Sequence, residues 1–168
     1  GDLDVDAMQR AIVHLIQRHE PLRTTIVERD GRPVAQISEE PRVPFEYIDL
    51  RDSEDRERID RLTANESREP FDLAAGPLIR AKILQAEPGR HRLLLTVHHI
   101  AADGWSLGVM MHDLHKFYSA ERGSNGGPPA PLAIEYRDYA AWQNEQLQSG
   151  VLNAQIDYWR TALDDVPV

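Results

Sequence analysis

The sequence predicts an α/β or α+β sandwich, because two hydrophobic periodicities alternate along its 168 residues. Apolar residues three and four positions apart, typical of helices, open the chain and return after residue 104. Between them lie segments in which apolar and polar residues alternate, bounded by Asp-Gly and Pro-Gly turn signals. The composition is 41% hydrophobic, so the chain can form the core of one domain or of one lobe of a larger domain.

The first expected element is an amphipathic helix over residues 4–19, which Asp4 can cap and Pro21 ends. Its apolar stripe consists of Val5, Met8, Ile12, Leu15 and Ile16. Two strand-like segments follow, residues 22–28 and 34–38. The Asp-Gly pair between them predicts a β-hairpin.

The middle of the chain is expected to hold a short strand over residues 45–48 and a charged, solvated surface helix within 52–69. A second hairpin is expected to pair residues 78–85 with the apolar strand 91–99 across a Pro-Gly turn. A further helix begins after Gly104. Its apolar residues at helical spacing are Leu107, Met110, Met111, Leu114, Phe117 and Tyr118.

A Gly- and Pro-rich stretch over residues 123–131 predicts a loop or linker, and two helices are expected after it. One spans residues 136–148. The other carries a single stripe made of Leu152, Ile156, Trp159 and Leu163. No strand pattern follows the last helix, so we expect the chain to be cut short.

The charge balance argues against nucleic acid and anionic membranes as partners. Lysine and arginine number 19 against 28 aspartate and glutamate residues, the net charge is -9, and the basic residues are scattered. No apolar run is long enough to span a bilayer and the acidic start is unlike a secretory signal, so a cytoplasmic protein is expected. The absence of cysteine excludes disulfides, thiol nucleophiles and cysteine metal sites.

Residues 98–106 join the end of an apolar strand to the start of a helix and hold two adjacent histidines. Neighbouring residues on a strand face opposite sides, so His99 shares an apolar face with Leu95 and Val97, and His98 lies on the other face. His99 is therefore the better candidate for a partly desolvated, neutral imidazole that accepts a proton. His98 is expected to be structural.

Asp103 can orient an imidazole or pair with a buried cation, Gly104 permits a tight turn or a close approach by a ligand, and Ser106 can cap the helix. A second interpretation is that two histidines, a turn and a cap coincide here without a shared chemical role, and spacing alone does not decide. No metal site is predicted, because adjacent strand histidines diverge and no nearby Cys, Glu or third His completes a ligand set. A serine hydrolase would need a Gly-x-Ser-x-Gly elbow, which the sequence lacks.

The same segment resembles the His-His-x-x-x-Asp-Gly signature of nonribosomal peptide synthetase condensation domains, including the Trp-Ser pair that commonly follows it. Three more segments resemble motifs of that family in the same order. They are Arg18-His19-Glu20-Pro21-Leu22-Arg23-Thr24, Pro70-Phe71-Asp72-Leu73 with Gly76-Pro77-Leu78, and Tyr136-Arg137-Asp138-Tyr139-Ala140-Ala141-Trp142. The resemblance covers essentially the whole chain.

The resemblance implies a two-layer sandwich that forms one of two lobes, each similar to chloramphenicol acetyltransferase, with a reaction tunnel between them. Residues 1–168 are then expected to be the N-terminal subdomain of a condensation domain, without its extreme N-terminus and without the whole C-terminal lobe. Because the tunnel needs both lobes, the fragment alone is expected to be inactive.

For the site, the resemblance implies that His99 is the catalytic histidine and that a salt bridge joins Arg23 to Asp103. Asp103, Arg23 and His98 are then structural members of the motif. The Gly104 N–H, close to a helix start, can face an oxyanion.

Three other residues of the matched motifs are expected to have no chemical role. Arg18, near the end of the first helix, is expected to be solvated or to interact with the helix dipole. Tyr139 and Trp142 are three positions apart on an expected helix, a spacing typical of core packing.

The activity implied by the resemblance is formation of an amide between an acyl, peptidyl or aminoacyl thioester and the amine of an aminoacyl thioester. No cofactor would bind directly, since both substrates are attached to the phosphopantetheine arms of donor and acceptor peptidyl carrier proteins. The other partners would be the C-terminal lobe and neighbouring synthetase domains. An epimerisation domain and a catalytically silent domain that recruits carriers or enzymes are the alternatives. The Trp-Ser pair and the last motif favour condensation over epimerisation, and the paired histidines argue against a heterocyclisation domain.

Overall fold

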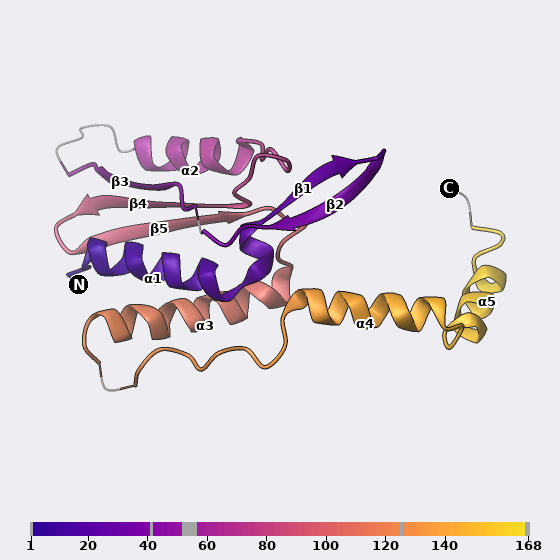
Figure 1. Cartoon of the computed structure of the whole chain (residues 1–168). Helices are drawn as coiled ribbons and strands as arrows, with labels where there is room; N and C mark the ends of the chain where they lie inside the picture. The colour runs from indigo at the N-terminus through magenta and orange to yellow at the C-terminus, as the bar shows by residue number, and fades with distance from the viewer. Residues whose placement is uncertain (1, 41, 52–56, 125, 167–168) are drawn as a thin grey trace. The chain divides into compact units, whose positions relative to one another are not determined.

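The computed structural model describes residues 2–40, 42–51, 57–124 and 126–166 (Figure 1). The chain divides into two compact units, Gly1–Pro131 and Leu132–Val168. Mixed helices and strands make up the first unit and helices the second, so the α/β class expected from the sequence is confirmed.

A three-stranded sheet in the order β3-β4-β5 lies at the centre of the first unit (Figure 1). Strand β3 (Phe45–Asp49) pairs in parallel with β4 (Ile79–Glu87), and β4 pairs antiparallel with β5 (Arg90–Val97). Helix α2 (Arg58–Arg68) lies in the connection from β3 to β4, as a parallel pair requires. Figure 1 shows α2 on one side of the sheet and α1 with α3 on the other.

Both predicted hairpins are present. Strands β1 (Thr24–Arg29) and β2 (Arg32–Ile37) form a two-stranded antiparallel sheet. Asp30 and Gly31 both adopt positive φ, 52° and 73°, at its turn, which suits a tight hairpin. The second hairpin joins β4 to β5, but β5 ends at residue 97, so the expectation that it extends to residue 99 is wrong.

The core lies between the sheet and helices α1 (Val5–Arg18) and α3 (Gly104–Glu121). Asp4 caps α1, as predicted, by accepting a hydrogen bond of 2.8 Å from the N–H of Ala7. A short 3-10 turn, η1 (Glu20–Arg23), then leads into β1. The buried cluster consists of Ala11, Ile12, Leu15, Ile16, Leu22, Ile79, Ala81, Met110, Leu114 and Phe117.

Helix α2 corrects one expectation. The charged run was expected to form a solvated helix, yet Glu66 is only 3% exposed and faces the sheet. Its carboxylate contacts Arg80 and Lys82, two outward-facing positions of β4. The charges on this side of α2 therefore fix the helix against the sheet. Residues 52–56 of the expected helix lie outside the described residues.

The second unit contains the two predicted helices, α4 (Tyr136–Gln148) and α5 (Asn153–Ala162). Tyr139 contacts both Tyr136 and Trp142 along α4, with ring centroids 6.0 and 5.8 Å apart. Tyr139 and Trp142 nevertheless remain 42% and 54% exposed. Their spacing was expected to mean core packing, and that expectation is wrong for this structure.

Candidate active site

The histidine motif forms a tight turn between β5 and α3. The N–H of His98 donates at 3.0 Å to the carbonyl of Leu78, the residue before β4, which extends the strand pairing one residue past the end of β5. The N–H of Ala101 donates back to the carbonyl of His98 at 2.9 Å. His99 and Ile100 therefore occupy a turn, and strand alternation does not set the direction of the His99 side chain.

The two histidines have different environments. His98 is half-buried, and its Nδ1 accepts a hydrogen bond of 3.0 Å from the N–H of Ile100. Its ring is nearly perpendicular to that of Phe71, at 88°, with the centroids 5.7 Å apart. His99 is exposed in this chain, so the expectation of a partly desolvated imidazole at this position is wrong here.

The contact to Ile100 also determines the protonation pattern of His98. A ring nitrogen that accepts a hydrogen bond carries no proton, so the proton of a neutral ring lies on Nε2. The Nδ1 atom of His98 is thus used in a hydrogen bond within the turn itself. His99, by contrast, is presented to solvent at the tip of that turn.

Asp103 is the N-cap of α3. Its Oδ1 accepts hydrogen bonds from the N–H of Ser106 at 2.8 Å and from the Ser106 hydroxyl at 2.6 Å. These hydrogen bonds from Ser106 hold the pKa of Asp103 below its usual value. Ser106 was expected to cap the helix, but it donates to the cap residue instead.

Arg23 does not pair with Asp103, which corrects the expected salt bridge. Arg23 donates to the carbonyl of Ser38 at 2.6 Å and lies 3.7 Å from Glu20, its neighbour in the same 3-10 turn. Asp103 faces the free N–H groups at the start of α3. No ion pair joins the two residues, both of which belong to the described part of the chain.

Gly104 is the first residue of α3, where backbone N–H groups are not used by the helix itself. It is exposed, and a Cβ added there would meet no atom within 4 Å. The space next to Gly104 is therefore open to a ligand. A donor role toward an oxyanion stays a prediction.

The surface around this turn is apolar. Trp105 directly follows Gly104 and is 85% exposed. The other exposed large apolar residues on the turn and on α3 are Ile100, Leu107, Val109 and Met111. An imidazole, the start of a helix and an apolar surface thus lie together in the first unit.

Sequence reasoning missed a buried ion cluster between α1 and α3. Arg18 Nε lies 2.8 Å and His19 Nε2 2.9 Å from the same oxygen of Asp113, which is only 5% exposed. Arg18 also donates to the carbonyl of Ala130. The expectation that Arg18 is solvated is therefore wrong. A carboxylate within the apolar stripe of α3 was the available signal, because such a group needs a cationic partner.

A second missed cluster lies between α2 and the sheet. Glu66 contacts Arg80 Nε at 2.7 Å and Lys82 Nζ at 3.0 Å. Burial raises the pKa of Glu66, but the hydrogen bonds from Arg80 and Lys82 outweigh it and leave the pKa below its usual value. Hydrogen bonds to Glu66 and to Glu46 raise the pKa of Lys82.

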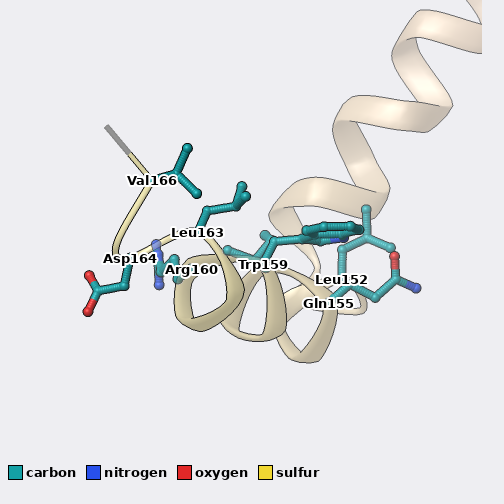
Figure 2. A pocket seen from close by; sticks show the side chains of 8 residues that line it. Leu152, Gln155, Trp159, Arg160, Leu163, Asp164 and Val166 are labelled. Carbon is teal, nitrogen blue, oxygen red and sulfur yellow. The ribbon is translucent and has the colours of Figure 1, made fainter. Parts of the chain in front are cut away.

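The second unit has an open hollow of about 650 Å³ beside α5 (Figure 2). It is lined by Leu152, Gln155, Ile156, Trp159, Arg160, Leu163, Asp164 and Val166. Arg160 forms an ion pair with Asp157 at 3.2 Å. The hollow is mainly apolar, and we assign no chemistry to it.

No group of three or more His, Cys, Asp or Glu residues in the described part of the chain is arranged to hold a metal ion. Within the same residues, no helix is long and apolar enough to cross a membrane.

Comparison with known families matches residues 1–167 to the model of the condensation domain. The chain belongs to this family. Malpibaldin synthetase of Mortierella alpina is 42% identical over 170 residues, covering 100% of this chain and 3% of the synthetase. Bacitracin synthase 2 of Bacillus licheniformis is 35% identical over 169 residues, which are 100% of this chain and 6% of that protein. The chain thus spans a few per cent of the length of these relatives.

Solved structures agree with this assignment. The X-domain from teicoplanin biosynthesis, in complex with OxyB, superposes with a TM-score of 0.86 and 30% identity. The match covers 99% of this chain and 37% of that one. The family resemblance expected from the four motifs is confirmed, together with the chloramphenicol acetyltransferase-like α/β fold.

Proposed function

We propose that this chain supplies the histidine motif of a condensation domain that forms amide bonds between carrier-bound substrates. One observation carries the proposal: within the family motif, His99 is exposed on a turn that hydrogen bonds fix at both ends, whereas His98 is occupied by that turn. A reacting group needs this combination of access and fixed position.

The reaction is attack of an acceptor amine on a donor thioester. The C–N bond forms as the amine nitrogen adds to the thioester carbon, and a zwitterionic tetrahedral intermediate results. His99 accepts or holds the ammonium proton, and the N–H of Gly104 stabilises the oxyanion. The C–S bond then breaks, and the proton leaves with the thiol of the donor arm. The amide remains on the acceptor arm.

The substrates define the partners in this proposal. Donor and acceptor peptidyl carrier proteins deliver the two thioesters on phosphopantetheine arms, so the chain needs no bound cofactor of its own. The remaining part of a condensation domain would supply the opposite wall of the tunnel. The open space at Gly104 and the apolar residues around the turn suit a surface that such a wall covers.

The test is single-turnover transfer between loaded carriers in the complete condensation domain, normalised to folded protein. His99→Ala should fold and lose about 10²–10⁴-fold in rate, the usual contribution of a positioned acid-base group. His98→Ala is the comparison: it removes the Nδ1 contact to Ile100 but keeps His99, so it should lower the melting temperature and leave residual activity in the folded fraction, with a smaller loss of rate than His99→Ala. A folded, inactive His98→Ala next to a fully active His99→Ala would reverse the assignment.

Two acceptors of different amine reactivity separate the possible roles of His99. If His99→Ala fails with both acceptors, His99 acts in proton transfer. If it fails only with the less reactive acceptor, His99 chiefly positions the amine.

A recruiting domain is the second candidate function, and the X-domain structure favours it because that protein is seen in complex with OxyB. An epimerisation domain is also among the structural relatives, at 24% identity. Loaded carriers in D₂O distinguish these activities by mass spectrometry. Formation of the amide supports condensation. Deuterium at the donor α-carbon without amide supports epimerisation, and the absence of both products supports recruitment.

A further inference from the structure

Arg80 connects helix α2 to the loop that carries Phe71. Its Nε lies 2.7 Å from Glu66 Oε1, and its Nη2 donates to the carbonyl of Glu69 at 2.9 Å. Its Nη1 donates to the carbonyl of Pro70 at 3.3 Å. The side chains of Arg80 and Glu66 are only 12% and 3% exposed. The guanidinium plane is thus fixed by an acid and by the carbonyl groups directly before Phe71.

Phe71 lies between this guanidinium and the histidine motif. Arg80 Cζ is 3.9 Å from the centroid of the Phe71 ring, within the range of a cation–π contact. The Phe71 ring also contacts the ring of His98, and the two ring planes are nearly perpendicular. An aromatic pair of this geometry has a preferred orientation, which a branched aliphatic side chain does not impose.

His98 has two further anchors, and they differ in what they fix. The hydrogen bond from its N–H to Leu78 fixes the backbone, and the Nδ1 contact to the Ile100 N–H depends on the ring orientation. Of the contacts described for the ring, Phe71 supplies the aromatic one. Without it, the imidazole can rotate away from Ile100, and the turn that contains His99 loses one of its hydrogen bonds.

We propose that Phe71, fixed by Arg80 and Glu66, is a positioning residue that holds the His98 ring as an Nδ1 acceptor and thereby sets the place of His99. Phe71 itself touches no reacting group. The kinetic part rests on the proposed function of His99, whereas the structural part does not.

The first test is the tautomer of His98, measured by ¹⁵N NMR in the complete condensation domain labelled at histidine. The wild type should show Nδ1 without a proton and Nε2 protonated. Phe71→Leu, which keeps apolar bulk, should give a mixture of tautomers, and Phe71→Tyr, which keeps the ring, should restore the wild-type pattern. Phe45→Leu is the matched control, because Phe45 is partly buried against the core on β3. A wild-type pattern in Phe71→Leu overturns the proposal.

The second test is the single-turnover rate at saturating carriers. Phe71→Leu should lower this rate about 10- to 100-fold with an unchanged half-saturation concentration, the size expected from a reacting group displaced by about 1 Å. Phe71→Tyr should recover most of the rate, and Phe45→Leu should not change it. An unchanged rate in Phe71→Leu, or a loss of the same size in Phe45→Leu, overturns the proposal.

The two tests distinguish failure of the proposed function from failure of the positioning role of Phe71. If the wild-type domain forms no amide, the proposed function falls, and the His98 tautomer still decides whether Phe71 positions that ring. If Phe71→Leu does not fold, Arg80→Lys replaces it, because lysine keeps the charge and lacks the planar fork that contacts Glu66 and the carbonyls. A wild-type His98 tautomer in Arg80→Lys then overturns the proposal.

Discussion

Asp103 uses its carboxylate at the first turn of α3, where the backbone N–H and the hydroxyl of Ser106 both donate to one oxygen. The N–H groups at a helix start have no partner within the helix, so a side-chain acceptor at this position stabilises the fold. The acid of the motif therefore fixes the start of α3, next to the open N–H position of Gly104. Its contribution to stability must depend on its ionisation.

Asp103→Ala should lower the melting temperature of the complete domain, and the loss should depend on pH. Because the folded-state pKa of Asp103 lies below its usual value, its stabilisation is fully present above the unfolded-state pKa of about 3.9 and is lost as the pH falls through the folded-state pKa. Asp103→Asn keeps a capping oxygen without ionisation, so its advantage over Asp103→Ala should not change over that range. Chemical denaturation from pH 7 down to pH 3 checks this. A constant difference between wild type and Asp103→Ala would contradict it.

Gly76 and Gly31 differ in the space available for a side chain. Both adopt positive φ, 57° and 73°, but a Cβ on Gly76 would lie 2.8 Å from Cγ2 of Thr25, and one on Gly31 would meet nothing within 4 Å. Gly76→Ala should therefore destabilise the fold by about 1–3 kcal/mol more than Gly31→Ala. Thr25→Ser removes that methyl group and should reduce the excess. Urea denaturation measures all three, and equal losses in the two alanine variants would refute the contact.

Helix α3 has two carboxylates, and each contacts one arginine and one histidine on or next to α1. Asp113 takes Arg18 and His19 in a buried position, with 7% of its side chain exposed. Glu121, the last residue of α3, contacts Arg10 and His14 of α1 in the same way, but these contacts are more exposed. Hydrogen bonds, chiefly from Arg10, hold the pKa of Glu121 below its usual value.

Asp113→Ala should lower the free energy of unfolding by about 3–5 kcal/mol, because it leaves the guanidinium of Arg18 buried without its carboxylate. Glu121→Ala is the control, and its effect should be small because exposed ion pairs contribute little. Denaturation at low and at 1 M salt tests the argument, since only the exposed pair should be screened. Equal losses in the two variants would contradict it.

The sequence predicted elements better than the pairing of charges. The Asp-Gly and Pro-Gly turns and the helical stripes are local signals, so both hairpins and the positions of all the described α-helices could be read directly from the chain. The partners Arg18 and Asp113 are 95 positions apart, and no local pattern joins them. The end of β5 at residue 97 was missed for a related reason, since a turn closed by the carbonyl of His98 interrupts an apolar run.

In the whole molecule, the same limit applies to the site. The motif segments are adjacent in the structure in ways that their order does not reveal: Phe71 reaches His98, and Arg80 holds Phe71. The family and its fold could be recognised from four motifs, because those motifs are short runs that can be read along the chain. The environment of each side chain could not be predicted from the sequence, because it depends on contacts between β4, α2 and the turn.

The two units of the molecule should also behave differently in solution. Every residue of the buried cluster belongs to the first unit, whereas α4 and α5 have no buried residue. Trp142, Val151 and Trp159 of the second unit are each more than half exposed. Apolar side chains at such exposure promote association.

A shortened protein of residues 1–131 should therefore unfold cooperatively at nearly the same temperature as residues 1–168, because it keeps the whole cluster. It should also associate less, since the exposed aromatic residues of α4 and α5 are removed. Circular dichroism measures the first quantity and sedimentation velocity the second. Trp142→Ser combined with Trp159→Ser in the longer chain is the control, and it should reduce association without a change in melting temperature. Loss of cooperative unfolding in residues 1–131 would show that the second unit is needed for the first to fold.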